Sequence, residues 1–194
     1  MLPPHARFVA AHPIAGTEDS GAGAATADLF EGSRCILTPT ARTDPRALAA
    51  VKRMWRDVGA RVIELDAAAH DRILGAVSHL PHVVAYALVN AVTASRGDAL
   101  AYAGGGFRDF TRIAASHAGM WRDIVLDNRA NVLPGIDATI AELSRMRALI
   151  ERGDAHALEE AFDQARITRR ALGPGGARPA RRAAAKRATR PAPR

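Results

Sequence analysis

The first third of the chain alternates short apolar runs with one amphipathic segment. Residues 8–11 are apolar and are followed by polar, Pro and Gly positions, a pattern that predicts a buried strand. Residues 34–38 and 60–65 predict two more strands. Between these two, Asp44-Pro45 is a helix start, and apolar residues then recur at helical spacing up to Gly59. Strand, helix and strand in this order predict a parallel pair with a right-handed crossover.

From Asp66 onward the pattern is helical. Asp66 or a neighbour caps a helix that continues to Val77 and is interrupted at residues 78–82. Residues 83–94 are apolar on nearly all sides, and a helix that one small domain cannot bury completely indicates a subunit interface. Further helices are expected at residues 107–115, 120–126, 132–150 and 155–172, and residues 22–30 predict a short helix or an ordered loop.

These elements predict an α/β remnant of a doubly wound, Rossmann-like sheet in residues 1–66, followed by an all-α dimerisation domain in residues 67–172. A glycine-rich dinucleotide loop is not found before the strand-helix-strand unit, and Gly104-Gly105-Gly106 follows a helical pattern instead of a strand. We therefore expect that the chain does not bind a dinucleotide tightly by itself.

The net charge of +7 belongs to one segment. Residues 173–194 contain seven Arg and Lys and no acid, so the rest of the chain sums to zero. Pro, Ala, Gly and Arg dominate this segment, which predicts a disordered basic C-terminal tail. Such a tail is either a solvated appendage or a weak, nonspecific contact for nucleic acid or anionic lipid.

Other sequence features bear on the cellular location of the protein. No run of eighteen apolar residues is present, and the N-terminus has neither a basic nor an apolar signal region, so we expect a cytoplasmic protein without a membrane span. Cys35 is the single cysteine and is most simply a small buried apolar residue.

The first candidate for chemistry is the segment His12-Pro13-Ile14-Ala15-Gly16-Thr17-Glu18. We expect His12 at the carboxyl end of its strand, where open α/β sheets bind ligands, with Pro13 ending the strand and Glu18 folding back toward the imidazole. The alternative is a turn histidine that is hydrogen-bonded to backbone.

A second candidate is Ser78-His79-Leu80-Pro81-His82, in which the two imidazoles lie one helical turn apart. One histidine can be a packing or hydrogen-bonding residue, and His82 beside Ser78 can face a substrate. A zinc site of His12, His79, His82 and Glu18 is a further alternative.

A third candidate is an oriented arginine. Asp109 precedes Arg112 by three residues, so on a helix it can hold the guanidinium in a fixed direction to receive a carboxylate. Trp121 can cover an apolar ring. The alternatives are an exposed salt bridge for Arg112 and core packing for Trp121.

With these three segments, and with Met120-Trp121-Arg122-Asp123 at the expected interval, the chain resembles the prephenate dehydrogenase family over about residues 6–172. The resemblance implies an NAD- or NADP-dependent oxidative decarboxylation of prephenate, or of arogenate, in tyrosine biosynthesis by a homodimer. It also implies that His12 takes the ring hydroxyl proton and that Arg112 binds a substrate carboxylate. Ser78 and His82 would line the pocket, Trp121 would pack nearby, and Glu18 would order or gate it.

The chain departs from this family at its beginning, because the nucleotide-binding half, with its glycine-rich turn, its ribose selector and a serine that assists His12, does not precede His12. This departure predicts a truncated gene, a late start or a fragment that is inactive alone. The alternative function is a non-catalytic helical dimer that binds a small carboxylate or tyrosine without turnover.

Overall fold

The computed structural model describes residues 6–16, 21, 23 and 25–173. The chain divides into two compact units, residues 1–147 and 148–194, and each is described by itself. Glu18 and the basic tail, residues 174–194, lie outside the described residues.

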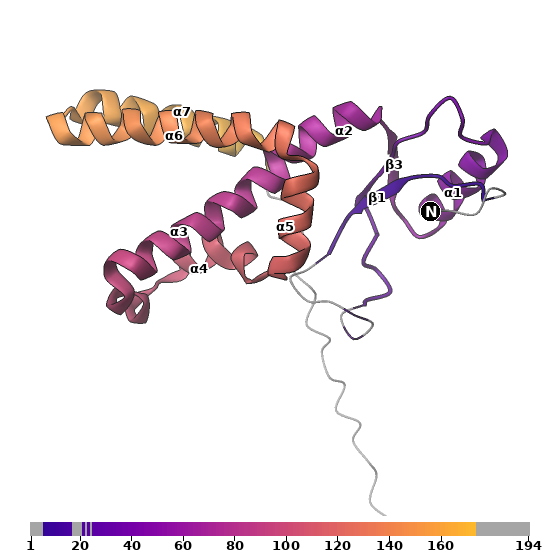
Figure 1. The fold of residues 1–194 in the computed structure, drawn as a ribbon, viewed down its shortest axis with the longest axis horizontal. Coiled ribbons are helices and arrows are strands. Elements are labelled where there is room, and N and C mark those ends of the chain that lie inside the picture. Colours follow the sequence, from indigo (N-terminus) through magenta and orange to yellow (C-terminus); the bar gives the residue numbers. More distant parts are fainter. Residues whose placement is uncertain (1–5, 17–20, 22, 24, 174–194) are drawn as a thin grey trace, which may run out of the picture. The chain divides into compact units, whose positions relative to one another are not determined.

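The first unit begins with a three-stranded sheet (Figure 1). Its strands are β1 (Ala11–Ile14), β2 (Arg34–Leu37) and β3 (Arg61–Glu64), in the order β1-β2-β3. Strand β2 pairs with β3 in parallel, with Cys35 opposite Val62, which confirms the predicted parallel pair. Strand β1 is antiparallel to β2 and forms one edge of the sheet.

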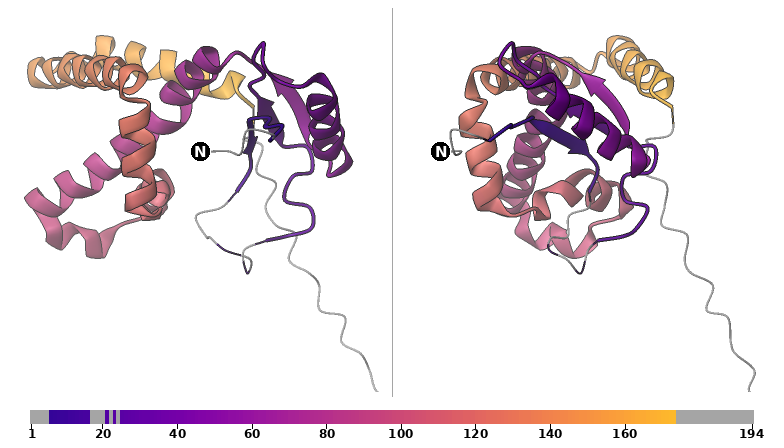
Figure 2. Two further views of the ribbon diagram at one scale, coloured as in Figure 1. Left: turned by 45° about the vertical axis from the view of Figure 1, so that its right-hand side comes forward. Right: turned by 90° about the vertical axis from the view of Figure 1, so that its right-hand side faces the viewer.

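Helix α1 (Pro45–Asp57) covers one face of this sheet (Figure 2). It begins as predicted, because the Asp44 carboxylate accepts a hydrogen bond of 2.8 Å from the Ala47 N–H. The core of this part consists of Cys35, Leu37 and Ala60, against which Trp55 of α1 packs. Cys35 is fully buried, as expected, and its burial raises the pKa of the thiol.

The prediction for the first strand was wrong in its position. Residues 6–10 are not a strand, Phe8 is exposed, and the strand begins at Ala11, so that His12 lies within β1 opposite Ile36. Pro13 does not end the strand but pairs with Cys35. A proline is tolerated here because β1 is an edge strand, where a missing N–H need not interrupt the ladder.

The predicted interruption at residues 78–82 was also wrong. Helix α2 (Ala67–Leu74) passes into the π-helical turn η2 (Gly75–His79) and then into α3 (Leu80–Arg96). Pro81 would remove a hydrogen bond and crowd a carbonyl in a regular helix. The wider turn accommodates it, since the Leu80 N–H bonds to the Gly75 carbonyl five residues back.

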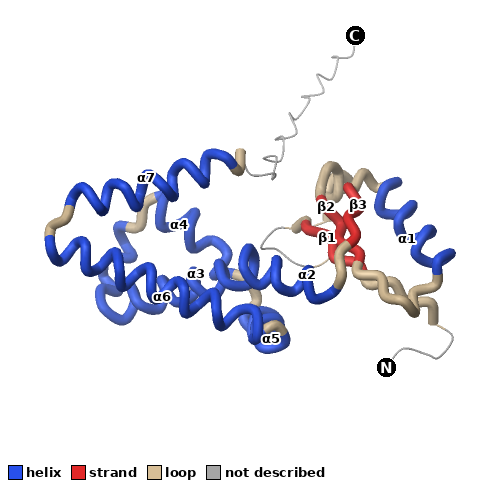
Figure 3. Tube along the Cα trace, turned by 90° about the horizontal axis from the view of Figure 1, so that it is seen from above, coloured by secondary structure: helices blue, strands red, loops and turns tan. Residues whose placement is uncertain are grey.

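The remaining helices agree with the predicted segments and extend some of them (Figure 3). In the segment 22–30, for which a short helix or an ordered loop was predicted, Gly23 has 3-10 helical conformation, and residues 27–32 are turns. The later elements are η3 (Gly97–Tyr102), α4 (Gly105–Thr111), η4 (Arg112–Ala115), α5 (Ala118–Asp127), α6 (Arg129–Arg152) and α7 (Ala155–Ala171). The end of α6 and helix α7 belong to the second unit.

One helical stretch, Ala67–Tyr102, is long and apolar enough to cross a membrane by length and composition alone, because it contains an 18-residue segment with a mean hydropathy of 1.3. No membrane span is predicted from the sequence, since a run of eighteen consecutive apolar residues is absent from it. Its side chains include His70, Asp71 and Arg72, which are costly in a bilayer. Few of its residues are buried within the chain, which agrees with the expectation of a covering partner for the apolar segment 83–94.

Candidate functional site

Two histidines from different elements of the first unit are hydrogen-bonded to each other. His12 of β1 and His70 of α2 lie with Nδ1 of the first 2.9 Å from Nε2 of the second. The ring planes are inclined by 59°. The bond brings the edge strand of the sheet to the first helix of the helical part, and His12 is left exposed on its other side.

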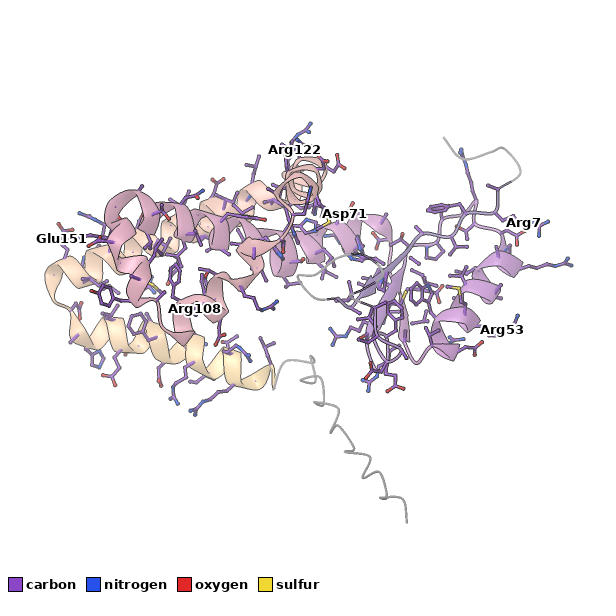
Figure 4. The ribbon with its side chains drawn as sticks, turned by 90° about the horizontal axis from the view of Figure 1, so that it is seen from below. Arg7, Arg53, Asp71, Arg108, Arg122 and Glu151 are labelled. Carbon is purple, nitrogen blue, oxygen red and sulfur yellow. The ribbon has the colours of Figure 1, made fainter. Side chains whose placement is uncertain are left out.

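The carboxylate of Asp71 continues this chain of contacts. Its Oδ1 lies 2.9 Å from His70 Nδ1, and the residue can be followed on α2 in Figure 4. Asp71, His70 and His12 therefore form a linear series of a carboxylate and two imidazoles.

Asn128, the C-cap of α5, fixes the neighbouring part of the site. Its side chain is buried, and its Nδ2 donates to the Asp71 carbonyl at 2.8 Å and to His79 Nδ1 at 3.1 Å. Asn131 Nδ2 in turn donates to Asn128 Oδ1 at 2.7 Å, which orients the amide. His79 Nδ1 is therefore an acceptor, and its proton lies on Nε2.

His82 is held by a carbonyl and by an aromatic ring. Its Nδ1 donates to the Ser78 carbonyl at 2.8 Å, so in the neutral ring Nε2 is the acceptor. The Trp121 ring stacks on it with centroids 3.3 Å apart and an interplanar angle of 17°, and meets His79 edge-on at 6.1 Å. Trp121 Nε1 is buried without a hydrogen-bond partner among the described residues, so packing fixes this ring.

The surroundings favour neutral imidazoles in three of these histidines. Burial, and secondly the charge of His70, lowers the pKa of His12. Burial and the neighbouring imidazoles lower the pKa of His79, partly opposed by Asp71. Burial and the charge of Arg112 lower the pKa of His82, against the hydrogen bond to Ser78. A neutral imidazole with a free lone pair is a suitable proton acceptor near neutral pH.

The structure brings some of the predicted site residues together and not others. Ser78, His82 and Trp121 are together, and Arg112, at the start of η4, is close enough to His82 to affect its charge. That Asp109 orients Arg112, and that Arg112 faces His12 across a cleft, stay predictions. The Glu18 position also stays a prediction.

The described residues give no support to the alternative of a zinc site. Within residues 6–16, 21, 23 and 25–173, no three His, Cys, Asp or Glu side chains are grouped as metal ligands. His12 and His79 instead direct nitrogens to His70 and to Asn128.

Sequence reasoning missed three residues of the site: His70, Asp71 and Asn128. The local sequence gives little reason to single them out. His70 and Asp71 lie one turn after the Asp66 cap, where a His-Asp pair is common on a helix surface. Asn128 follows a helix, where Asn is an ordinary C-cap residue. Only the contacts through space separate them from such surface residues.

A shallow depression of about 340 Å³ lies elsewhere in the first unit. It is lined by residues of the segment before β1 and of the β2-α1 loop, among them Arg7, Thr38 and Asp44. It does not include any of the four histidines.

Comparison with protein families gives two matches along the chain. Residues 1–64 match the family described as prephenate dehydrogenase, nucleotide-binding domain, and residues 66–164 match prephenate dehydrogenase, dimerization domain. Together the two matches include β1 to β3 and most of the helical part.

Known proteins of this type are similar to the chain in sequence and structure. The cyclohexadienyl dehydrogenase of Zymomonas mobilis is 41% identical over 175 residues, which are 88% of this chain and 59% of that protein. The prephenate dehydrogenase of Bacillus subtilis is 38% identical over 89% of this chain and 47% of its own length. The crystal structure of prephenate dehydrogenase from Aquifex aeolicus, in complex with hydroxyphenyl propionate and NAD+, aligns with a TM-score of 0.79 and 45% identity over 86% of this chain and 59% of that chain. The chain thus spans about half to three fifths of the length of these relatives.

Proposed function

Because the chain belongs to the prephenate dehydrogenase family, we propose that it forms the proton-accepting and substrate-binding part of an enzyme that oxidises and decarboxylates prephenate to 4-hydroxyphenylpyruvate. The observation that supports this most directly is His12: an exposed imidazole of lowered pKa whose Nδ1 is engaged by His70. No finding favours the alternative of a non-catalytic dimer.

The proposed role of His12 is a proton transfer in both directions. As the ring carbon that bears the hydroxyl loses its hydride, the His12 imidazole takes the hydroxyl proton, and a carbonyl forms. The bond between the ring and its carboxylate then breaks, CO2 leaves, and the electron pair completes the aromatic ring. The phenolate oxygen that results takes the proton back from His12, so that protons and charge balance.

The other side chains are proposed to bind and orient. Arg112 receives a substrate carboxylate, with Asp109 holding its direction. Ser78 and His82 line the pocket, and the Trp121 ring that stacks on His82 supplies its apolar wall. Glu18 orders or gates the entrance.

The hydride acceptor is proposed to be NAD or NADP, which supplies the redox chemistry when bound. Among the described residues, the turn from β2 to α1 contains no glycine, so these residues do not form the phosphate cradle of a dinucleotide site. The proposed proton-transfer and binding roles belong to residues of this chain alone.

We further propose the organisation of the whole. Residues 1–66 are the end of the nucleotide-binding domain, residues 67–172 are the substrate and dimerisation domain, and two copies associate through the helical part. The enzyme is cytoplasmic in this proposal. A nucleic-acid contact of the basic residues 173–194 has no support from the relatives and is not proposed.

The binding part of the proposal can be tested on the chain itself. Hydroxyphenyl propionate, the ligand in the Aquifex aeolicus structure, should shift the side-chain NMR signals of His12, His82 and Trp121 in a saturable way. The Arg112→Gln variant should weaken this binding about tenfold or more. Saturable binding that leaves these three signals unmoved would contradict the assigned pocket.

The catalytic part needs a complete dinucleotide site. A chimera joins residues 1–194 to sequence of the Zymomonas mobilis relative that completes the nucleotide-binding domain, since the chain spans 59% of that protein. Incubated with prephenate and NAD+ or NADP+, it should form reduced nicotinamide and 4-hydroxyphenylpyruvate in equal amounts. A folded chimera that binds both ligands without forming either product would contradict the proposed reaction.

A further inference from the structure

We propose that Asp71 and His70 are positioning residues that hold His12 in one tautomer, with its proton on Nδ1 and its free lone pair on Nε2. The geometry that carries this is the series of two 2.9 Å contacts from Asp71 Oδ1 through His70 to His12 Nδ1. That the free Nε2 then serves as the base rests on the proposed function, whereas the tautomer does not.

The tautomer follows from donor and acceptor chemistry, starting at the carboxylate. An ionised carboxylate only accepts hydrogen bonds, so His70 must present its proton at Nδ1 to Asp71. A neutral His70 then has a lone pair at Nε2, which accepts from His12. His12 must therefore carry its proton on Nδ1, and its Nε2 is left to accept another.

The opposite arrangement would disable the base. If His70 donated from Nε2 to His12 Nδ1, the neutral His12 ring would carry its proton on Nε2 and would have no lone pair free for a substrate hydroxyl. In the arrangement set by Asp71, protonation of His12 at Nε2 leaves the bond from Nδ1 to His70 intact. The series thus holds the ring before and after it accepts a proton.

The charged and titratable groups around His12 are consistent with this series of hydrogen bonds from Asp71 through His70 to His12. His70 and Asp71 approach from α2, and His79 of η2 is near enough for its charge and that of His12 to affect each other. Asp71 is the acidic member of this group, so it compensates the positive charge when His12 is protonated.

The orienting pair is itself fixed to the helical part. The Asp66 side chain caps α2 through the Ala69 N–H at 2.8 Å, and the buried Asn128 amide bonds to the Asp71 carbonyl at 2.8 Å. His70 is mostly covered, with 18% of its side chain exposed, which restricts the imidazole to few positions.

The direct test reads the tautomer by imidazole 15N NMR on the chain itself at neutral pH. The expected result is a protonated Nδ1 and an unprotonated Nε2 in His12. In Asp71→Asn the amide can donate to His70 Nδ1, which reverses both rings, so His12 should shift to the Nε2-protonated form. The matched control is Asp163→Asn, an exposed carboxylate on α7 that bonds to Arg166 at 2.7 Å and should leave His12 unchanged.

Two results would overturn the inference: an Nε2-protonated His12 in the unsubstituted chain, or a His12 tautomer that is the same in Asp71→Asn. Since Asp71 is 54% exposed, its isosteric replacement is compatible with folding. The Asp71→Asn chimera should also lose about 100-fold or more of its rate while hydroxyphenyl propionate binding is retained. If the unsubstituted chimera is inactive but the tautomer is as stated, the proposed function fails and the positioning role does not.

Discussion

Asn128 connects α2, η2 and α6 at the site, because its one amide bonds to Asp71, to His79 and to Asn131. A buried side chain with this many partners cannot be shortened without leaving polar atoms unsatisfied. The Asn128 side chain therefore contributes both to the stability of the fold and to the geometry of the site.

Replacement of Asn128 by alanine should lower the free energy of unfolding by about 2–3 kcal/mol, since the hydrogen bonds are lost and their partners remain buried. Urea unfolding followed by circular dichroism measures this. The control is Gln164→Ala, at an exposed position of α7, where a change of less than about 0.5 kcal/mol is expected. Equal losses in both variants would contradict the role given to Asn128.

Sequence reasoning named some of the residues that the structure brings into contact, and their roles in a site stay predictions. His12 was predicted as a candidate from its place at a strand end, His82 from its spacing of one helical turn from His79, and Trp121 as a cover for an apolar ring near Arg112. His70 and Asn128 were not, because their importance comes from partners 58 and 49 residues away. Such contacts leave no pattern in the local sequence.

The element that joins α2 to α3 is the π-helical turn η2, and it packs closely against α6. A Cβ at Gly75 would lie 3.0 Å from Asn131 Cβ and 3.3 Å from Asn128 Nδ2. The turn therefore needs glycine for space, although its backbone angles at Gly75 are those of an ordinary helix.

For this reason Gly75→Ala should destabilise the protein by about 1–3 kcal/mol, because the added methyl group overpacks the contact and outweighs the higher helix propensity of alanine. Gly97 is the matched control: its backbone is also helical, and nothing lies within 4 Å of a Cβ there. Gly97→Ala should be neutral or stabilising by up to about 1 kcal/mol. Thermal unfolding of both variants measures the difference in stability. A Gly75→Ala protein as stable as Gly97→Ala would contradict the close packing at Gly75.

The elements themselves were predicted better than their boundaries. Periodicity and the Asp44 cap predicted α1, and the strand-helix-strand order predicted the parallel pair. The errors occurred at the two prolines, Pro13 and Pro81, which were interpreted as breaks. An edge strand and a π-helical turn accommodate them, and both depend on neighbouring structure that a local pattern does not contain.

For the whole molecule, the lowered pKa values of His12, His79 and His82 link folding to pH. Between the folded pKa of such a histidine and its unfolded value near 6.5, the unfolded chain binds more protons. The stabilisation is therefore complete above this window and is lost as the pH falls through it.

Urea unfolding at a series of pH values should accordingly show a free energy of unfolding that decreases from about pH 7.5 to about pH 5. The His82→Gln variant should show a shallower decrease, because one histidine with a lowered pKa is removed. Gln164→Ala, at an exposed position of α7 that carries no titratable group, should keep the original slope. A free energy of unfolding that increases toward pH 5 would contradict the lowered pKa values of these histidines.

The proposed role of His12, to accept the hydroxyl proton of the substrate, rests on the family and on the contact of its Nδ1 with His70. The measurement that tests it most directly compares the chimera with its His12→Ala variant, using the initial rate of reduced nicotinamide formation from prephenate and the Kd of hydroxyphenyl propionate. If His12 is the base, the rate should be at least about 100-fold lower in His12→Ala, with little change in Kd. An unchanged rate in a variant that binds the ligand normally would contradict it.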